Sequence, residues 1–553
     1  MSKVTDDFKK RLDGLFALVK EKVSRGNKVF VSTCCGQERA RVFVGTGNSL
    51  DTAFKAAKDL AVKHQGEYIN YIMIDVVTKE TPMTVREFYK KLLFPTRRGY
   101  LRYGISFDEF YDIAFLEQEI YGAGLIKYID KNNQYFYEEN ITSYLKKSRG
   151  FSSKYKFECD PSRDIIVFET RAVFDNGKEQ YELESSVDSL NKGYRITTLE
   201  QDEEALLDSV RATADYLLST QEKSGRTAYG YHACFDVPCP GYNILRHTLG
   251  MLALADIYLL TKERRYREGA IRGLKWMLNN YVYDLDDETS FVIDHINDNE
   301  TEIKLGGNSV AIVTIAKCIE ALDSEVERHA LMPIMRKLGN GILYMQSKKT
   351  GNYIHVLDYP SLEVKDEFRT IYYAGEAVFA LSCLYTLDND KKWMNSIKTA
   401  LKYYIANDFH KYNDHWIAYA VNEVSKHERN FDYFKFGLKN AFNDLDFIIN
   451  RDTTWNTFLE MLNASVLLYM QIEKAGETKL LRKYDFDELV KAQEIRFRLQ
   501  QASIMAPEMA MFFKYPYKIM HGIFIRHHSF RVRNDDVAHH IMGYCTYYRT
   551  KKL

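Results

Sequence analysis

The chain has 553 residues, enough for two to four domains at roughly 100–200 residues per domain. Its 76 basic and 76 acidic residues balance, so no net charge favours nucleic acid or an anionic membrane as a partner. The sequence has no run of 18 apolar residues, so we expect no integral membrane segment. Eight irregularly spaced cysteines and a charged N-terminus without a signal peptide predict reduced thiols and a cytoplasmic location.

Residues 1–190 mix helical and strand patterns. Apolar residues at helical spacing or in short β-branched runs predict the elements of this region in chain order. They are a helix over 3–25, strands over 28–33 and 41–44, a helix over 50–64, a strand over 68–77, helices over 84–95 and 107–121, and a hairpin turning at 175–177. We therefore expect a mixed α/β accessory domain over 1–190, to which no motif assigns a reaction.

From about residue 200 onward the pattern is almost wholly helical. The predicted helices span 206–220, 244–260, 265–282, 307–322, 327–346, 374–386, 391–406, 415–424, 432–449, 453–473 and 486–502. Pairs of about 40 residues match two helices and two turns, and five or six such pairs close into a ring. The fold class is thus predicted to be mainly α: an α/α toroid of helical hairpins over 200–486, preceded by the smaller α/β domain, with 487–553 as a helical cap closing the toroid.

Two stretches of this region repeat each other. A shift of 127 residues places Ala253 on Ala380 and Tyr258 on Tyr385. Both stretches begin with polar residues and continue as an apolar helix, which is typical of stacked hairpins that bury a shared core. We expect the polar residues that begin each inner helix to meet at one rim, and we interpret that rim as the site.

Four residues are candidates for acid/base chemistry. Glu376 precedes an apolar helix, where an unpaired buried carboxylate is costly, so it needs a partner or a role. Asp414 stands beside His415 and offers a carboxylate and an imidazole together. His247 shares the start of its helix with an arginine, and a histidine moves protons near neutral pH. The structural alternatives are an N-cap for Asp414 and a buried hydrogen-bond network for His247.

The substrate-binding candidates are polar and aromatic residues of the same stretches. Arginine holds carboxylates or phosphates, and aromatic rings stack on sugars. The set is Tyr242, Asn243, Arg246, Lys304, Asn308, His355, Arg369, Tyr372, Tyr373, Trp416, Asp535, Asp536 and His539. Structural readings stay open: Asn308 suits an N-cap, His355 is a lone histidine, and the last three residues suit a polar latch.

Metal-ligand spacings are weak in this sequence. Asp535 and His539 lie one helical turn apart, as a metal half-site would, but a third ligand is not evident. His232, Cys234, Cys239 and His247 have a spacing that matches no regular zinc module. We therefore expect no metal and no cofactor.

The repeat carries a resemblance to known enzymes. The segments ALADIYLLTKERRYREGAIRGLKWML and ALSCLYTLDNDKKWMNSIKTALKYYI resemble the helix–turn–helix phrase of the α/α-toroid (six-hairpin) carbohydrate-active enzymes. That superfamily includes glucuronyl C5-epimerases, unsaturated glucuronyl hydrolases and six-hairpin glycosidases. The resemblance covers roughly 205–480 and implies an architecture and a saccharide substrate, not a reaction. The phrases YNILRH, KLGGNS, YYAGEA, DHW and RNDDVAHH also resemble bacterial proteins associated with surface-polysaccharide synthesis.

The leading hypothesis is a carbohydrate-active enzyme that hydrolyses an acidic polysaccharide or oligosaccharide, with Glu376 and Asp414 as the acid/base pair. One alternative is a uronic-acid epimerase or lyase with tyrosine or histidine as the proton carrier. Another is a non-catalytic toroid that binds a glycan or a partner in a surface-polymer assembly. Expected partners are the saccharide and polysaccharide-synthesis proteins, and no nucleic acid. A close carboxyl pair across an open cleft would favour hydrolysis.

Overall fold

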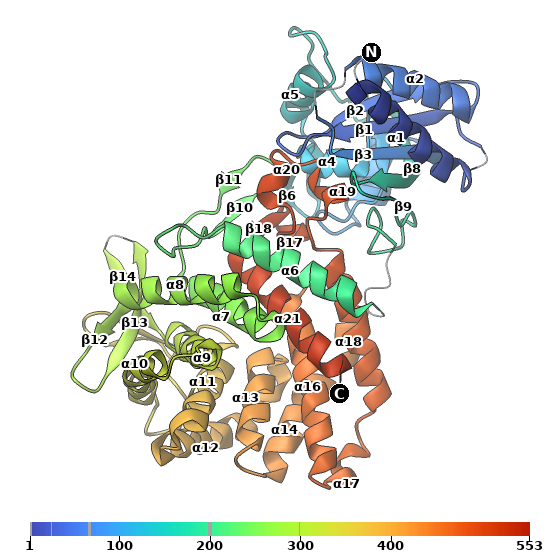
Figure 1. Cartoon of the computed structure of the whole chain (residues 1–553). Coiled ribbons are helices and arrows are strands. Elements are labelled where there is room, and N and C mark those ends of the chain that lie inside the picture. The colour runs from blue at the N-terminus through green and yellow to red at the C-terminus, as the bar shows by residue number, and fades with distance from the viewer. Residues whose placement is uncertain (1–2, 24, 65–67, 197–201, 298, 553) are drawn as a thin grey trace. The chain divides into compact units, whose positions relative to one another are not determined.

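The computed structural model of the protein describes residues 3–23, 25–64, 68–196, 202–297 and 299–552. The chain forms two compact units, and each is built from three segments of the sequence (Figure 1). The first unit comprises Met1–Thr198, Tyr231–Pro238 and Gln501–Val532. The second comprises Leu199–Gly230, Cys239–Gln500 and Arg533–Leu553.

The first unit is organised around an antiparallel sheet of order β2-β1-β3-β8-β4-β5, with β9 paired to β8. Its strands are β1 (Lys28–Cys34), β2 (Arg41–Thr46), β3 (Tyr71–Thr84), β4 (Gly104–Ser106), β5 (Ala114–Phe115), β8 (Asp164–Asp175) and β9 (Gln180–Glu182). Side chains alternate across this sheet. Val29 and Val31 face α1 (Lys3–Lys20) and α2 (Leu50–Lys63), while Phe30 belongs to the cluster on the other face with Met511 and Phe512.

Smaller elements complete this unit. They are α3 (Val85–Phe88), the π-helix η1 (Tyr89–Leu93), α4 (Glu117–Gly122), β6 (Ile126–Asp130), β7 (Asn133–Phe136), α5 (Glu138–Ser148), β10 (Gly230–His232), β11 (Val237–Pro238), α19 (Pro507–Ala510), α20 (Pro516–Ile519), β17 (Phe524–Ile525), the 3-10 helix η3 (Arg526–His528) and β18 (Arg531–Arg533). The helix predicted over 107–121 is wrong for most of its length, since only its end, from Glu117 in α4, is helical. The Asp108 carboxylate accepts backbone hydrogen bonds from Asp112 (2.9 Å) and Ile113 (2.8 Å), which closes a loop instead of capping a helix.

The second unit is a closed ring of helical hairpins (Figure 1). Its inner helices are α7 (Ile244–Thr261), α9 (Leu305–Ala321), α11 (Tyr373–Asp388), α13 (His415–Ser425), α16 (Asn456–Lys474) and α21 (Asn534–Lys551). Each contacts the next in this order, and α21 contacts α7. The outer helices are α6 (Glu203–Ser219), α8 (Arg264–Tyr281), α10 (Glu325–Tyr344), α12 (Lys391–Ala406), α14 (Phe431–Phe442) and α18 (Phe486–Gln501). The predicted fold class, an α/α toroid with a smaller α/β region, is confirmed.

The remaining elements of this unit are a five-stranded antiparallel sheet and short connections. The strands are β12 (Val282–Asp284), β13 (Ser290–Asn297), β14 (Glu300–Lys304), β15 (Val356–Asp358) and β16 (Val364–Asp366), paired in that order. The connections are the 3-10 helix η2 (Phe409–Tyr412), α15 (Leu445–Asn450) and α17 (Thr478–Leu481). Because β14 runs directly into α9, the sheet adjoins the end of the ring at which the inner helices begin.

The structure divides residues 487–553, which the sequence analysis assigned to a cap. Helix α18 is an outer helix, residues 501–532 belong to the first unit, and α21 is the sixth inner helix. Helix α21 has the layout of an inner helix: polar residues in its first turn, followed by buried Val537, Ala538 and Ile541. These apolar side chains let α21 pack closely against both α16 and α7.

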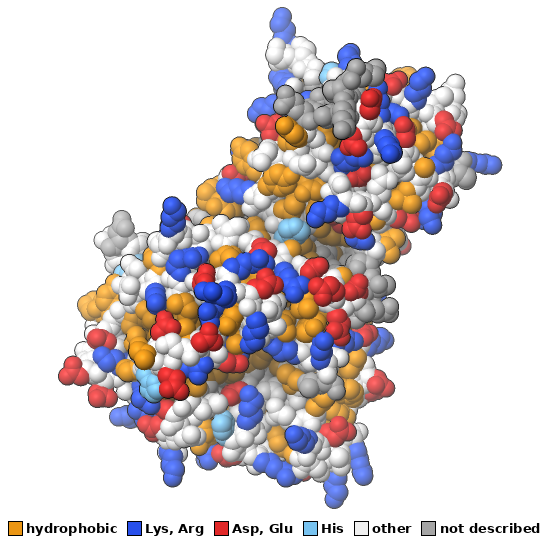
Figure 2. Space-filling model, viewed as in Figure 1, with side chains coloured by type: hydrophobic (Ala, Val, Ile, Leu, Met, Phe, Trp, Pro, Cys, Tyr) orange, Lys and Arg blue, Asp and Glu red, His pale blue; other side chains and the backbone are white. Residues whose placement is uncertain are grey.

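The visible surface and the most apolar helix can be compared with the charge and membrane expectations of the sequence. Figure 2 shows basic and acidic side chains interspersed over the visible face. In the described part of the chain one helix, α7, is long and apolar enough to cross a membrane. It is an inner helix of the ring, and 72% of its apolar window is buried.

Candidate functional site

The first turns of the inner helices meet at one rim of the toroid. Arg246 at the start of α7 pairs with Asp535 in the first turn of α21 (2.7 Å). Glu460 near the start of α16 pairs with His539 of α21 (2.7 Å). The ring centre of His415, the first residue of α13, lies 5.2 Å from that of His539. Polar residues from α7, α13, α16 and α21 therefore converge, as the repeat predicted.

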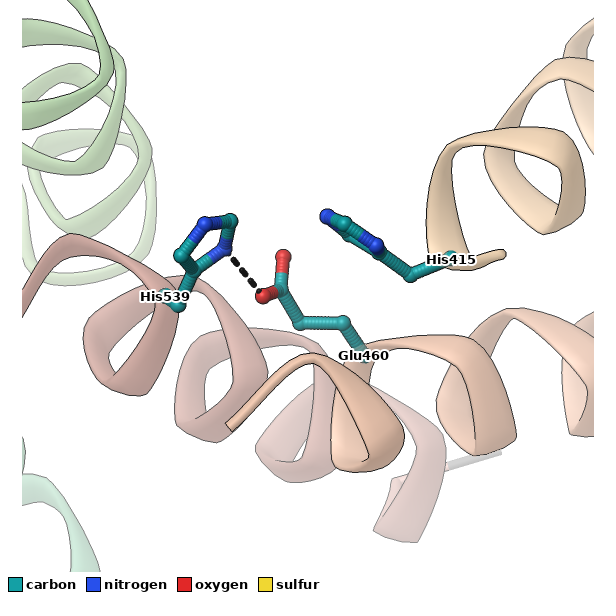
Figure 3. A group of neighbouring side chains, drawn as sticks. All are labelled: His415, Glu460 and His539. Carbon is teal, nitrogen blue, oxygen red and sulfur yellow. Dashed lines mark hydrogen bonds and ion pairs between the residues drawn. The ribbon is translucent and has the colours of Figure 1, made fainter. Parts of the chain in front are cut away.

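The centre of this rim is a buried carboxylate between two imidazoles (Figure 3). Glu460 has no exposed surface, and its two oxygens accept hydrogen bonds from His539 Nδ1 (2.7 Å) and the Tyr419 hydroxyl (2.8 Å). His415 lies opposite His539, and among the described residues neither of its ring nitrogens has a hydrogen-bond partner, although its Nδ1 lies 3.4 Å from Asp414 Oδ1. A buried imidazole without a hydrogen bond is costly, so this geometry suits a group that bonds a ligand.

The two histidines are held in different protonation states. Burial lowers the pKa of His415 to about 3, so this imidazole is neutral. Burial would also lower the pKa of His539, but the charges of Glu460, Asp535 and Asp536 outweigh it and raise that pKa above its ordinary value. A neutral acceptor thus faces a cationic donor, the division of roles that acid/base chemistry needs.

A charged network flanks this cluster. Asp535 lies between Arg246 (2.7 Å) and Arg533, and these cations lower its pKa despite burial. Arg246 also donates to the Tyr229 hydroxyl, while about 30% of its side chain stays exposed. Aromatic rings also lie beside the cluster: Tyr419 stacks on half-buried Phe379, with ring centres 5.5 Å apart. Arginine and aromatic rings at one rim are suitable for orienting a sugar.

The pair predicted to hydrolyse a glycosidic bond is enclosed. Glu376 is 4% exposed and Asp414 is fully buried, and one oxygen of each has no hydrogen-bond partner. Burial raises both pKa values well above the ordinary range, and for Glu376 the nearby Asp414 adds to the rise. A Cβ added at Gly306 would lie 2.3 Å from Glu376, and one at Gly375 would lie 2.4 Å from Asp414. The glycines therefore let neighbouring backbone close over both carboxyls.

Several other candidates have structural partners. Asp414 caps α13 by accepting from the Trp416 amide (3.0 Å), and Asn243 caps α7 in the same way. His247 is buried within 3.0 Å of both Thr227 and Tyr242, and burial lowers its pKa to about 4. This is the buried network named as its structural alternative.

The candidates near the five-stranded sheet are also engaged within the protein. Lys304 pairs with Asp294 (2.6 Å), and Arg369 holds Glu302 through two nitrogens (2.6 and 3.1 Å). Asn308 bonds the backbone of Val292, and His355 accepts from the amide of Arg369. Tyr372 and Tyr373 line α11 beside these groups, with the Tyr372 ring 5.5 Å from His415.

The site contains a set of atoms suited to a metal. One ligand atom each of His415, Glu460 and His539 lies within 4.8 Å of the others, and in the described part of the chain no second group of this kind was found. Two imidazoles and one carboxylate suit a first-row transition ion. The half-site suggested by Asp535 and His539 differs from this set, because Asp535 is paired with arginines.

Sequence reasoning did not select Glu460 or Tyr419. Glu460 is the only charged residue in the first half of α16 and lies among Phe458, Leu459, Met461 and Leu462, which was a usable signal for a functional carboxylate. His539 was predicted to bind substrate and not to transfer protons. Its partner Glu460 is 79 residues away, and spacing along the chain does not show such a contact.

Comparisons with known proteins found matches among solved structures alone. No family model matches the chain, and no curated protein matches it. Among solved structures it is similar to a D-mannose isomerase (13% identity, 64% of this chain and 98% of that one, TM-score 0.46). It is also similar to the cellobiose 2-epimerase of Bacillus thermoamylovorans (11%, 63% and 100%, TM-score 0.47) and to an unsaturated glucuronyl hydrolase specific for heparin (11%, 64% and 99%, TM-score 0.43). This likeness concerns the α/α fold and transfers no residue role or reaction.

Proposed function

We propose that the protein is a sugar-active enzyme that moves a proton to and from carbon, as in isomerisation or epimerisation of an open-chain sugar. The observation that carries this proposal is the buried cluster in which His415 and His539 flank Glu460, where burial lowers the pKa of His415 and the neighbouring carboxylates raise the pKa of His539. Proton transfer at a carbon beside a carbonyl needs one group to accept a proton and one to donate it. Two histidines with opposite protonation states supply both.

Each residue then has a defined role. His415 accepts the proton from the carbon next to the carbonyl, and the electron pair of that C–H bond forms the enediol double bond. His539 donates its Nε2 proton to the carbonyl oxygen while its Nδ1–H stays bonded to Glu460. Delivery of the proton held by His415 to the former carbonyl carbon, with His539 taking the proton of the other enediol hydroxyl, gives an isomer. An epimer forms if the enediol turns its other face to His415, which reprotonates the same carbon while His539 takes back the proton it gave to the oxygen. Arg246 and the ring of Tyr419 orient the sugar.

Hydrolysis by Glu376 and Asp414 has less support. A general base or nucleophile must be ionised, and burial holds both carboxyls in the neutral form. The glycines at 306 and 375 bring other atoms against both groups, where a sugar and a water would have to fit. The alternative with histidine as the proton carrier is therefore preferred over the hydrolytic one.

A second candidate is a metal-assisted version of the same chemistry, favoured by the donor set of His415, Glu460 and His539. A bound divalent ion would supply Lewis-acid polarisation of a carbonyl. For this to occur His539 must lose the proton that it shares with Glu460, because a metal ligand must be deprotonated.

The experiment is a substrate screen in deuterium oxide followed by ¹H NMR. The panel contains D-mannose, cellobiose and an unsaturated heparin disaccharide, chosen from what similar structures act on. Loss of the C2–H signal together with an isomeric product supports the proposal. Release of monosaccharide without deuterium at C2 supports hydrolysis instead and would overturn it.

The finer expectations remain predictions. They are an acidic saccharide, a cytoplasmic location and partners from polysaccharide synthesis. The screen addresses the first, because the heparin disaccharide is its one acidic member.

A further inference from the structure

The first unit contains a cavity of about 430 Å³. Its wall is mostly apolar and aromatic and includes Leu93, Ile120, Tyr121, Ile126, Phe235 and Phe530. The basic residues in the wall are Arg97, Arg98, Lys127, His232 and Arg526, whereas none of its described residues is Asp or Glu. This volume is typical of sites for small molecules, and the lining has one sign of charge.

Arg526 is the most deeply buried of these cations. Its side chain is 3% exposed, and its Nη2 atom has no hydrogen-bond partner among the residues that the structure describes. The nearest carboxylate is Glu117, at 3.8 Å from Nη1. Glu117 is already bonded to Arg102 (3.0 Å) and Lys192 (2.7 Å), so three buried cations share one buried anion. Burying uncompensated charge is costly, and this imbalance is relieved by an anion near Arg526.

Arg98 also lines this cavity. It bonds Ser529 and stacks on the Tyr128 ring, 4.4 Å from the ring centre. Neither contact neutralises its charge, and burial lowers its pKa. Arg98 contacts no carboxylate in the described ranges of the chain, and a half-buried guanidinium with an aromatic neighbour then favours a bidentate contact to an anionic ligand.

Two glycines in left-handed conformations shape the cavity. Gly99 has φ +81°, and a Cβ there would lie 2.7 Å from the Arg526 carbonyl oxygen. Gly124 has φ +62°, and a Cβ there would lie 2.7 Å from the Phe235 ring. Both positions need glycine because the backbone approaches a wall residue closely. The wall is thus a specific arrangement of three distant chain segments.

We propose that this cavity binds a small organic anion, with a phosphate or carboxylate group held by Arg98 and Arg526 and an aromatic or aliphatic body against Tyr121, Phe235 and Phe530. The charges of the wall set the sign of the head group, and the apolar remainder excludes a fully hydrated ion. The site lies within the first unit, to which neither the sequence nor the proposed sugar chemistry assigned a role. Its test is independent of activity in the toroid.

Isothermal titration calorimetry of the full chain tests this with four probes. They are 1-naphthyl phosphate, 1-naphthoate, 1-naphthol and inorganic phosphate. We expect one site per chain for at least one of the two naphthyl anions, and at least tenfold weaker binding of both naphthol and phosphate. The two anions distinguish the phosphate from the carboxylate head group.

Variants locate the site. R98Q should weaken binding of the preferred naphthyl anion at least tenfold, and F235A should weaken it as well. R195Q removes an equal charge from the Glu179 ion pair outside the cavity wall and should bind as wild type. R526Q should weaken binding of the anion as R98Q does, provided that the variant folds. If R526Q does not fold, the result for R98Q decides whether the proposal holds. Equal binding of naphthol, no binding of either anion at millimolar concentration, or unchanged binding by R98Q would overturn the proposal.

Discussion

Two glutamates at the same rim of the toroid illustrate what a buried acid needs in order to act. Glu460 on α16 is fully buried, yet His539 and Tyr419 donate to both of its oxygens. Glu376 on α11 is 4% exposed and has one oxygen without a partner. The charge of Glu460 raises the pKa of His539. Burial instead raises the pKa of Glu376 and so favours its neutral form. The sequence singled out Glu376 at the start of an inner helix but not Glu460, and it showed the partners of neither.

The largest expected effect is that of removing the proton donor. H539N should lower kcat/KM by about 10²–10⁴-fold, the usual contribution of a positioned acid or base, with the fold retained. The matched control is H427N, an exposed histidine just beyond the end of α13. Its kcat/KM should equal that of wild type. An H539N enzyme as active as H427N would contradict the assignment.

Next in size is the effect of the charge on Glu460. E460Q keeps the shape and should lower kcat/KM by about tenfold or more, because the pKa of His539 falls when its ion-pair partner is removed. Activity needs the protonated form of His539 and is lost as pH rises through that pKa. The alkaline limb of the pH profile should therefore move to lower pH in E460Q. Y419F keeps the charge and should leave the limb in place; a limb that does not move in E460Q would refute this link.

Substitution of Glu376 should change the catalytic rate little and the thermal stability clearly. E376Q replaces a neutral group by a neutral isostere, so its rate should stay within about threefold of wild type. A hundredfold loss would restore the hydrolytic pair as the leading mechanism.

The stability effect of E376Q has a defined sign. Because its folded-state pKa is raised, Glu376 stabilises the fold below its unfolded pKa near 4.5, and this contribution is lost as pH rises toward the folded value. Glutamine carries no such dependence. The Tm of E376Q relative to wild type should therefore increase between about pH 5 and pH 8. A constant difference would show that Glu376 is not held neutral.

The smallest expected effect is that of a chelator. If His539 keeps its proton against Glu460, the three donor atoms at this rim hold no metal, and dialysis against EDTA should leave the wild-type rate unchanged. Loss of activity with EDTA, and recovery with one divalent ion, would favour the metal-assisted alternative over the histidine pair.

Much of the toroid was predictable from local patterns, and the contents of its centre were not. Apolar runs located the inner helices, and the repeat predicted that their polar first turns share a rim. Closure by α21 was not predictable from spacing, because its contact with α7 joins residues such as Arg246 and Asp535 that are 289 positions apart. Likewise the predicted helix over 107–121 begins instead with a loop that the Asp108 carboxylate closes through two backbone bonds, an outcome that periodicity does not distinguish from a helix.

The roles of the candidate residues were also only partly predictable, because their partners come from distant parts of the chain. His415 and His539 were named from their chemistry, but their opposed protonation states depend on Glu460, Asp535 and Asp536 brought together by the ring. Arg369 and Lys304 were plausible sugar ligands until the sheet supplied Glu302 and Asp294 as partners. Residue type predicts which chemistry is available, whereas the fold decides which groups are already satisfied.

The most direct test of the account is a ¹⁵N NMR titration of the histidine rings in the wild-type protein, with assignments from H415N and H539N. We predict that His539 titrates above the ordinary value of 6.5, and that His415 stays neutral over the whole range in which the protein is folded. A His415 ring that gains a proton near neutral pH, or a His539 ring that loses its proton below 6.5, would contradict the central claim that one imidazole accepts and the other donates.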